Sequence, residues 1–173
     1  MTQELIDLRT SILEGRYEDA LAIVDELEGM SKQAILRNIE SFLLRLMVHL
    51  IKNKIEQRLT NSWAASISDS IRQIKKLNLK DNKTSYYINV DEWQPFLEEA
   101  IEAAINPASV EVVNGRFKPN QLSQMLDKLQ LAIIAQRLLS LTYDYSAKDL
   151  PAIVNSNLAY LPGGEDWLSS ADS

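Results

Sequence analysis

The stretch LLRLMVHLIKNKIEQRLTNSWAASISDSIRQIKKL, residues 43–77, decides the fold. Apolar residues recur at helical spacing on both sides of a short polar break, where Thr60 or Asn61 can cap the helix that follows. The pattern predicts two helices, Ser31–Arg58 and Ser62–Leu77, that double back on each other at this break. Because the first is apolar nearly all round in its middle, we expect the pair to lie at the centre of the protein.

The N-terminal residues predict a helical hairpin. Two apolar stripes with helical spacing follow one another, the first ended by Gly15 and the second by Gly29. Glycine is typical of a helix end because it adopts the left-handed conformation at little cost. The central helix would then begin afresh at Ser31, which is a good capping residue.

Downstream of the central pair, the polar and turn-rich segment 78–90 predicts a loop. Asp91 and Gln94 then have the spacing of a capping box, which predicts the start of a helix. Asn106-Pro107 either kinks that helix or restarts it, because proline lacks a backbone donor yet is favoured in a first turn.

The segment 110–118 is ambiguous. Asn114-Gly115 between β-forming residues is typical of a hairpin, but the same glycine could end a helix, and we favour the helix. Pro119 then opens a strongly apolar helix that we expect to run through Leu141.

Ser146 and Asp149 form a second capping-box pattern and predict a last helix over Pro151–Leu161. The chain therefore predicts the all-α class, as a single-domain bundle of six to seven helices around a long central antiparallel pair. We expect this domain to span residues 1–162, and we expect residues 163–173 to form a disordered acidic tail.

Composition indicates an ordered protein in a reducing compartment. Of the 173 residues, 46% are hydrophobic and 24% charged, which is sufficient for a core. The absence of cysteine suits the cytoplasm, and the acidic N-terminus argues against a signal peptide. The longest nearly uncharged apolar run, Phe42–Ile51, has about half the length of a membrane crossing, so we expect a cytoplasmic protein without a membrane partner.

The residue inventory excludes several chemistries. With one histidine and no cysteine, the chain cannot build a Cys/His zinc site or a di-iron site with two Glu-x-x-His pairs. It has no phosphate-binding loop, dinucleotide fingerprint or Gly-x-Ser-x-Gly elbow. We therefore expect no metal, no cofactor and no catalytic residue set.

His49 is the sharpest candidate for a working side chain. In the predicted hairpin it would lie level with Arg72 and could hydrogen-bond Asp69, while the charge of Arg72 would lower its pKa. Such a polar cluster could supply a general base or an anion contact. The alternative, which we favour, is a histidine whose hydrogen bonds are satisfied within a helix interface.

Charge is distributed unevenly along the chain. The net charge is −6, but residues 45–83 carry nine bases and three acids, a net of +6, which leaves −12 on the remainder. These bases could contact phosphates while Tyr86, Tyr87 and Trp93 stack on nucleic-acid bases. In a compact bundle, the acidic flanking helices would instead neutralise much of the charge. The candidate anion or nucleic-acid patch comprises Lys52, Lys54, Arg58, Arg72, Lys75, Lys76, Lys80 and Lys83.

The stretch EGMSKQAILRNIESFLLRLMVHLIKNKIEQRLTNSWAASISDSIRQIKKL resembles the uncharacterised all-helical family called domain of unknown function twenty-nine, which is abundant in cyanobacteria. The family pattern is a long helix ending in Leu-Leu-x-His-Leu-x-Lys, a short basic turn, and Ser-Trp before a helix with Arg and Ile. Two positions that are often basic in the family are Ala64 and Ile71 here, which argues against an anion site. The matching residues are Leu46, His49, Leu50, Lys52, Ser62, Trp63, Ile67, Arg72 and Ile74; Leu46, Leu50, Trp63 and Ile67 would be structural.

The resemblance covers roughly residues 15–105. It implies a helical fold and a cyanobacterial origin, but no activity, ligand or catalytic residue. From the residues themselves, we expect a non-enzymatic interaction or scaffold protein that binds a protein partner or a second copy of itself through an exposed helix face. The alternatives are a nucleic-acid-binding module that uses the basic segment, and a small ligand or enzymatic site around His49 and Arg72.

Overall fold

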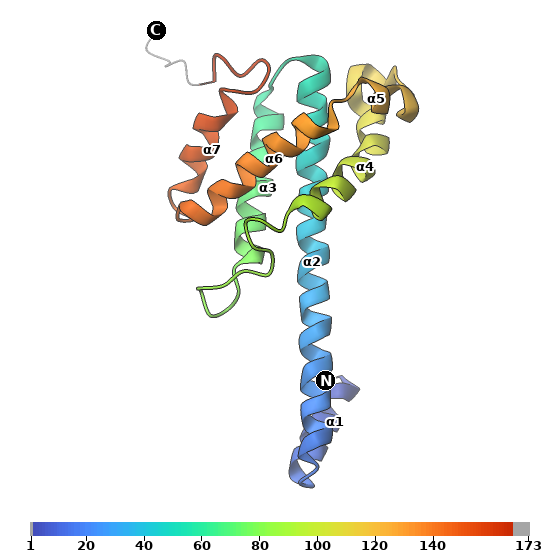
Figure 1. Cartoon of the computed structure of the whole chain (residues 1–173), viewed down its shortest axis with the longest axis vertical. Helices are drawn as coiled ribbons and strands as arrows, with labels where there is room; N and C mark the ends of the chain where they lie inside the picture. The colour runs from blue at the N-terminus through green and yellow to red at the C-terminus, as the bar shows by residue number, and fades with distance from the viewer. Residues whose placement is uncertain (1, 168–173) are drawn as a thin grey trace. The chain divides into compact units, whose positions relative to one another are not determined.

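The computed structural model describes residues 2–167, and this part of the chain is helical, without a β-strand. The predicted all-α class is confirmed. Contacts divide the chain into two compact units, one ending at Asn38 and the other beginning at Ile39. The predicted domain limits, 1–162, stay a prediction. Figure 1 shows the helices α1 (Gln3–Leu13), α2 (Tyr17–Glu56), α3 (Asn61–Asn78), α4 (Gln94–Glu111), α5 (Pro119–Met125), α6 (Lys128–Asp144) and α7 (Leu150–Leu158), and the 3₁₀ helix η1 (Val112–Gly115).

The first unit contains α1 and the beginning of α2. Gly15, with a φ of +76°, turns the chain out of α1 as predicted. The predicted helix end at Gly29 is wrong, because α2 continues through Gly29 and Ser31. Gly29 has no positive φ, and the neighbouring Glu, Met and Lys residues are good helix formers that offset its cost of about 1 kcal/mol.

In the second unit, the C-terminal part of α2 and α3 form the predicted antiparallel pair (Figure 1). The Thr60 hydroxyl accepts a hydrogen bond from the backbone N–H of Trp63 over 3.1 Å, which caps α3 as predicted. Gln57, with a φ of +52°, ends α2 two residues earlier than expected. The pair supplies the centre of the core, whose fully buried side chains include Leu43, Leu46, Met47, Ile51, Ile67, Ile71 and Ile74.

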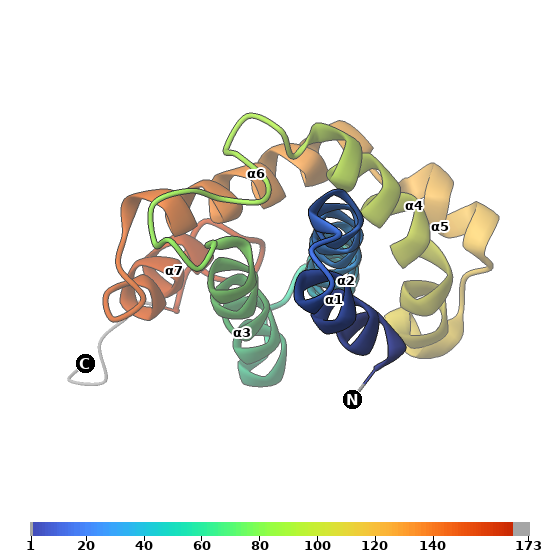
Figure 2. The same ribbon diagram turned by 90° about the horizontal axis from the view of Figure 1, so that it is seen from below.

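The remaining helices of the second unit pack around this pair. α6 crosses the unit and contacts α3, α4 and α7, and α7 also packs against α3. α4, α5 and η1 pack together on the opposite side of α2 from α3 and α7 (Figure 2). The C-terminal ends of α3 and α6 meet, because Lys75 donates to the Thr142 carbonyl over 2.6 Å. Basic side chains of α3 therefore lie beside the loops that precede α4 and α7.

α4 begins later than predicted and ends in a left-handed turn. Its N-cap is Trp93, and the predicted capping box at Asp91 does not form. The helix runs through Pro107 without restarting. After Glu111, Val113 and Asn114 adopt positive φ values of 46° and 57°, so the ambiguous segment is neither a hairpin nor a continued helix. Asparagine adopts this left-handed conformation readily, whereas valine rarely does. The sequence therefore indicates a turn at Asn114 but not at Val113.

The helix predicted from Pro119 is interrupted. Leu126 is extended, and the Asp127 carboxylate accepts a hydrogen bond from Gln130 N over 3.0 Å, which caps a separate helix, α6. At α7, the Ser146 hydroxyl accepts from Asp149 N over 3.2 Å. This bond is half of the predicted capping box, and α7 ends at Leu158 rather than Leu161.

A buried hydrogen-bond network anchors the loop between α3 and α4. Asn78 donates to the Ile88 carbonyl (2.8 Å) and to the Tyr143 hydroxyl (3.1 Å), and its amide oxygen accepts from Ile88 N (2.8 Å). The Trp93 indole donates to Tyr143 over 2.8 Å, and that hydroxyl donates to the Ile88 carbonyl over 2.6 Å. Burial raises the pKa of Tyr143, against the opposing effect of these donors. The loop predicted at 78–90 is thus ordered, and it contains one β-bridge, between Leu79 and Tyr86.

The segment after α7 is tied to the turn between α2 and α3. Buried Asn53 donates to the carbonyls of Arg58 (3.0 Å) and Pro162 (2.7 Å). Gly163 has a φ of +71°, and a Cβ there would lie 2.6 Å from Arg58 Cα, so no other residue fits without displacing backbone. Residues 163–167 of the predicted tail form turns, and residues 168–173 lie outside the described residues.

Candidate functional site

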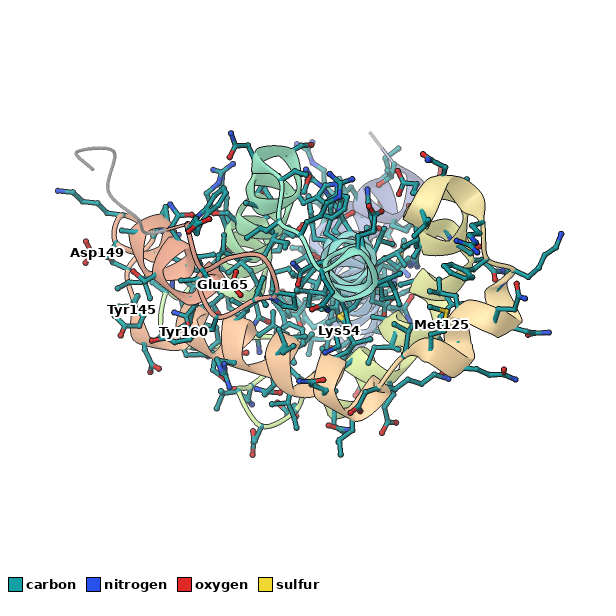
Figure 3. The ribbon with its side chains drawn as sticks, turned by 90° about the horizontal axis from the view of Figure 1, so that it is seen from above. Lys54, Met125, Tyr145, Asp149, Tyr160 and Glu165 are labelled. Atoms are coloured by element: carbon teal, nitrogen blue, oxygen red, sulfur yellow. The ribbon has the colours of Figure 1, made fainter. Side chains whose placement is uncertain are left out.

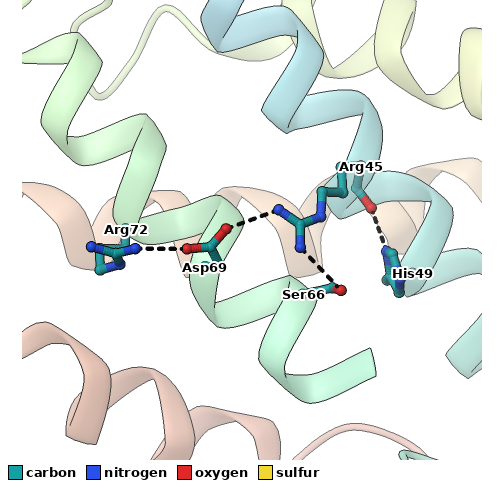
Figure 4. Close-up of polar contacts among 5 residues, drawn as sticks. All are labelled: Arg45, His49, Ser66, Asp69 and Arg72. Atoms are coloured by element: carbon teal, nitrogen blue, oxygen red, sulfur yellow. Dashed lines mark hydrogen bonds and ion pairs between the residues drawn. The ribbon is translucent and has the colours of Figure 1, made fainter. Parts of the chain in front are cut away.

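A charged cluster joins α2 to α3 (Figure 4). Arg45 of α2 donates to one carboxylate oxygen of Asp69 over 2.8 Å and to the Ser66 hydroxyl over 3.3 Å. Arg72 donates to the other oxygen of Asp69 over 2.8 Å. The hydrogen bond from Arg72 lowers the pKa of Asp69, and the bond and charge of Arg45 add to this effect against the opposing effect of burial. Two guanidinium groups thus share a single carboxylate.

His49 contacts the backbone of Arg45 and not Asp69. Its Nδ1 lies 2.8 Å from the Arg45 carbonyl oxygen, and because a carbonyl only accepts, Nδ1 carries the proton (Figure 4). The predicted hydrogen bond to Asp69 is wrong, because His49 Nδ1 bonds the Arg45 backbone, and the Asp69 carboxylate accepts from Arg45 and Arg72 instead. Burial lowers the pKa of His49, and the charges of Lys52 and Arg45 lower it further, while the hydrogen bond to the Arg45 backbone opposes the shift. The direction is as predicted, but Arg72 is not a cause.

The candidate residues His49, Asp69 and Arg72 therefore share one helix interface without forming a catalytic arrangement. Asp69 and Arg72 bond each other directly, whereas His49 is half-buried and bonds its own helix. A general base of the usual kind is oriented by a second polar group and faces a proton donor of the substrate. Here the orienting group is the backbone carbonyl of Arg45, so the ring is held by its own helix and not by Asp69 or Arg72.

The candidate basic patch is divided between the two ends of α3. Near the start of the helix, Lys52 Nζ and Arg58 Cζ lie 4.9 Å and 4.6 Å from the centroid of the Trp63 ring, which is a cation–π arrangement. Lys52 also pairs with Glu111 at 3.6 Å, and Arg58 pairs with Glu56 at 2.9 Å. Acids from the same unit thus neutralise these two bases.

Lys54 belongs to a different surface. It lines a pocket of about 410 Å³ together with Tyr160 and Glu165. Figure 3 labels all three side chains: Tyr160 and Glu165 belong to the loop after α7 and Lys54 belongs to α2, whereas Met125 lies on the α5 side of the unit. The acid and the base in this lining offset each other, so the pocket has no strong preference for an anion.

At the C-terminal end of α3, four bases line a single pocket of about 370 Å³, which we call the basic pocket. Arg72, Lys75 and Lys76 come from α3, and Lys83 comes from the loop that follows it. The only other lining residues are Leu79 and Ala147. Lys75 is half-buried and donates to the Thr142 carbonyl over 2.6 Å, and burial lowers its pKa. Lys80 lies instead over the Tyr87 ring, 5.4 Å from the centroid.

The aromatic residues expected to stack on nucleic-acid bases are engaged within the fold. Trp93 is fully buried and donates to Tyr143. Tyr86 packs edge-on against Tyr143, with ring centroids 4.6 Å apart, and Tyr87 lies under Lys80. A sequence-tolerant single-strand site needs open aromatic faces beside its bases, and these three rings are committed elsewhere.

Sequence reasoning missed Arg45 and the apolar wall of the basic pocket. The predicted register places His49 level with Arg72 and therefore Arg45 level with about Lys76, so it does not indicate the observed pair of Arg45 with Asp69. Ala147 could not be found in this way, because it reaches α3 through the packing of α6 and α7. The four residues expected to be structural, Leu46, Leu50, Trp63 and Ile67, are all buried.

Fold and site together define an all-α protein in which Arg45, Asp69 and Arg72 form ion pairs at one helix interface and four bases line a pocket at the C-terminal end of α3. Among residues 2–167, no group of three His, Asp or Glu side chains could hold a metal ion, and no helix is both long and apolar enough to cross a bilayer. The chain belongs to the family Domain of unknown function DUF29, whose sequence profile matches residues 13–131. Comparisons with curated proteins and with solved structures gave no match. The cyanobacterial origin implied by the resemblance stays a prediction.

Proposed function

We propose that this protein is a protein-interaction module and that its first unit, α1 with the beginning of α2, is the binding element. The observation that supports this role is the exposure of large apolar side chains around the turn between the two helices. Leu13, Tyr17 and Leu21 have exposed fractions of 79%, 66% and 63%. Exposed apolar surface of this kind is typical of an interaction site.

The first unit buries little of its own apolar surface. Between residues 2 and 38, only Ser11 and Ala20 are buried, although helical stripes of Leu, Ile and Val follow both helices. A two-helix hairpin gains most of its stability by packing an apolar face against a further element. A partner helix would supply that element and would cover Leu5, Ile6, Ile12, Leu13, Tyr17, Leu21 and Met30, which are all exposed.

Charge favours a basic partner. Residues 1–38 carry eight acids and four bases, a net of −4. On α2, the stripe that begins with Tyr17 and Leu21 continues with Asp25 and Glu28, and neither acid has an ion pair within the described residues. An amphipathic helix with apolar anchors followed by Lys or Arg would match this order, whereas a second copy of the hairpin would bring two acidic surfaces together.

The test is a titration of the full chain with a fluorescent amphipathic helical peptide that carries Leu on one face and Lys on the other, followed by anisotropy. We expect saturable binding that weakens with salt, and no binding of the same peptide with Glu in place of Lys. The double variant Leu13→Ser/Leu21→Ser should lose at least tenfold in affinity.

A matched control is the double variant Leu129→Ser/Tyr160→Ser, which removes two apolar side chains of comparable exposure, 70% and 78%, from the second unit. It should bind as the parent does, and helical circular dichroism should be unchanged in both variants. Equal loss in the two variants would overturn the assignment to the hairpin. A concentration-dependent dimer that only the Leu13→Ser/Leu21→Ser variant abolishes would replace the basic partner by a second copy of the chain.

A further inference from the structure

The basic pocket concentrates positive charge without a matching acid in its wall. Arg72, Lys75, Lys76 and Lys83 line it, and the remaining lining residues, Leu79 and Ala147, are apolar. Of the four bases, only Arg72 has an ion pair, with Asp69, among the described residues. Like charges that line one pocket repel one another, and an anion bound between them would offset that repulsion.

Lys83 occupies a backbone position that disfavours lysine. Its φ is +64°, a conformation in which glycine or asparagine carries little strain. The Asn82 side chain holds the turn by accepting from Thr84 N and Ser85 N, each over 3.0 Å. Local structure therefore does not explain a lysine here, and strain of this kind is concentrated at functional sites. A fourth positive charge at the pocket would explain it.

Lys75 is the innermost of the four bases. Its ammonium donates to the Thr142 carbonyl over 2.6 Å and has no carboxylate partner among the described residues. Burial lowers its pKa, so the charge is held there at a cost. An anion in the pocket would offset that cost and would receive the remaining donors of the ammonium group.

We propose that the basic pocket binds a small phosphorylated molecule with at least two negative charges, whose phosphate meets the four bases and whose apolar portion packs against Leu79 and Ala147. The volume of about 370 Å³ is at the lower end of the range for small-molecule sites and suits a ligand of mononucleotide size. The engaged aromatic rings of Tyr86 and Trp93 favour a small ligand over a nucleic-acid strand. This site lies wholly in the second unit, so it is independent of the proposed hairpin interaction.

The experiment is calorimetric titration of the full chain with inorganic phosphate, pyrophosphate and adenosine monophosphate at low and high salt. We expect pyrophosphate and the mononucleotide to bind, and the affinity to fall as salt rises. Lys75→Met and Lys83→Gly should each weaken binding by about tenfold, which corresponds to the loss of one charge-assisted contact. Lys83→Gly is the sharper variant, because it removes the charge and also relieves the backbone strain, so it should not unfold the protein.

Lys54→Met is the matched control, since Lys54 lines a different pocket, and it should leave the affinity unchanged. The proposal is overturned if neither pyrophosphate nor the mononucleotide binds at low salt, or if Lys75→Met and Lys83→Gly bind as tightly as the parent. It is also overturned if single-stranded RNA binds and pyrophosphate does not compete, because the ligand would then be a nucleic acid.

Discussion

The two compact units of this chain are built from the same kind of helix but use their apolar residues in opposite ways. In the unit that begins at Ile39, large side chains such as Ile71 and Trp93 are fully buried, and buried amides such as Asn78 have hydrogen-bond partners. In the unit that ends at Asn38, Leu13 and Leu21 are exposed, and the buried residues are the small Ser11 and Ala20. Helical periodicity alone does not distinguish these cases, because it specifies a face and not what covers it.

The largest expected effect separates the two units directly. Ile71→Ala should lower the free energy of unfolding by about 2–5 kcal/mol, because it leaves a cavity in the packed centre of the second unit. Leu13→Ala should change it by less than about 0.5 kcal/mol, since that side chain is exposed. Urea denaturation followed by circular dichroism measures both, and a comparable loss in Leu13→Ala would show that the hairpin surface is covered within the chain.

Removing hydrogen bonds from the buried network around Asn78 should have the second-largest effect on stability. Asn78→Ala should cost about 2–3 kcal/mol, because it removes three hydrogen bonds and leaves Ile88 N–H without its partner. Tyr143→Phe keeps the ring and removes only the hydroxyl, so it should cost about 1–2 kcal/mol. Thermal unfolding of the two variants tests this order. Equal stability of both variants and the parent would mean that water replaces the network.

In the first unit, one substitution should raise the stability of a helix instead of lowering it. Gly29→Ala should stabilise α2 by about 0.5–1 kcal/mol, because Gly29 lies within the helix and a Cβ there has no atom within 4 Å. The measurement is amide hydrogen exchange at residues 20–35, which should slow in the variant. Faster exchange would mean that Gly29 ends a helix in solution, as the sequence pattern first predicts.

The smallest expected effect concerns pH and the single histidine. Burial lowers the pKa of His49 below its ordinary value of 6.5, so the unfolded chain binds more protons than the folded one. This contribution to stability is therefore complete above about pH 6.5 and is lost as the pH falls toward the folded-state pKa. His49→Gln should remove that slope between pH 7.5 and 5.5. A parent whose stability rises over the same acid shift would contradict the predicted sign.

Much of the fold is readable from local signals that the structure confirms. The break at Thr60, the left-handed Gly15 and the loop before α4 each have one dominant cause close in sequence. The errors arise where two local preferences compete. A glycine such as Gly29 can end a helix or lie within one. The outcome depends on tertiary packing and on the helix propensity of the neighbouring residues. The break at Asp127 was missed because an apolar pattern continues across it.

The candidate site was less predictable because side-chain partners depend on register. Helix pairing correctly placed His49 and Asp69 on one interface. Which base bonds Asp69, however, depends on the length of the side chain, and the long side chain of Arg45 forms that hydrogen bond. The basic patch illustrates the same limit. Its residues are close in sequence, yet Lys52 and Arg58 lie near Trp63 while Lys75 and Lys83 share a pocket about twelve helical residues away, roughly 18 Å along α3.

The close approach of Gly163 to the backbone of Arg58 has a consequence for anyone who attaches a reporter to this protein. A fusion point between Pro162 and Gly164 would introduce side chains where the Arg58 backbone and the Leu158 carbonyl leave no room. It would also break the contact in which Asn53 donates to the Pro162 carbonyl. The same reporter joined after Trp167 would leave the hydrogen bond from Asn53 to the Pro162 carbonyl intact. Fluorescent labelling or immobilisation should therefore begin beyond this residue, so that the label does not itself loosen the end of α2.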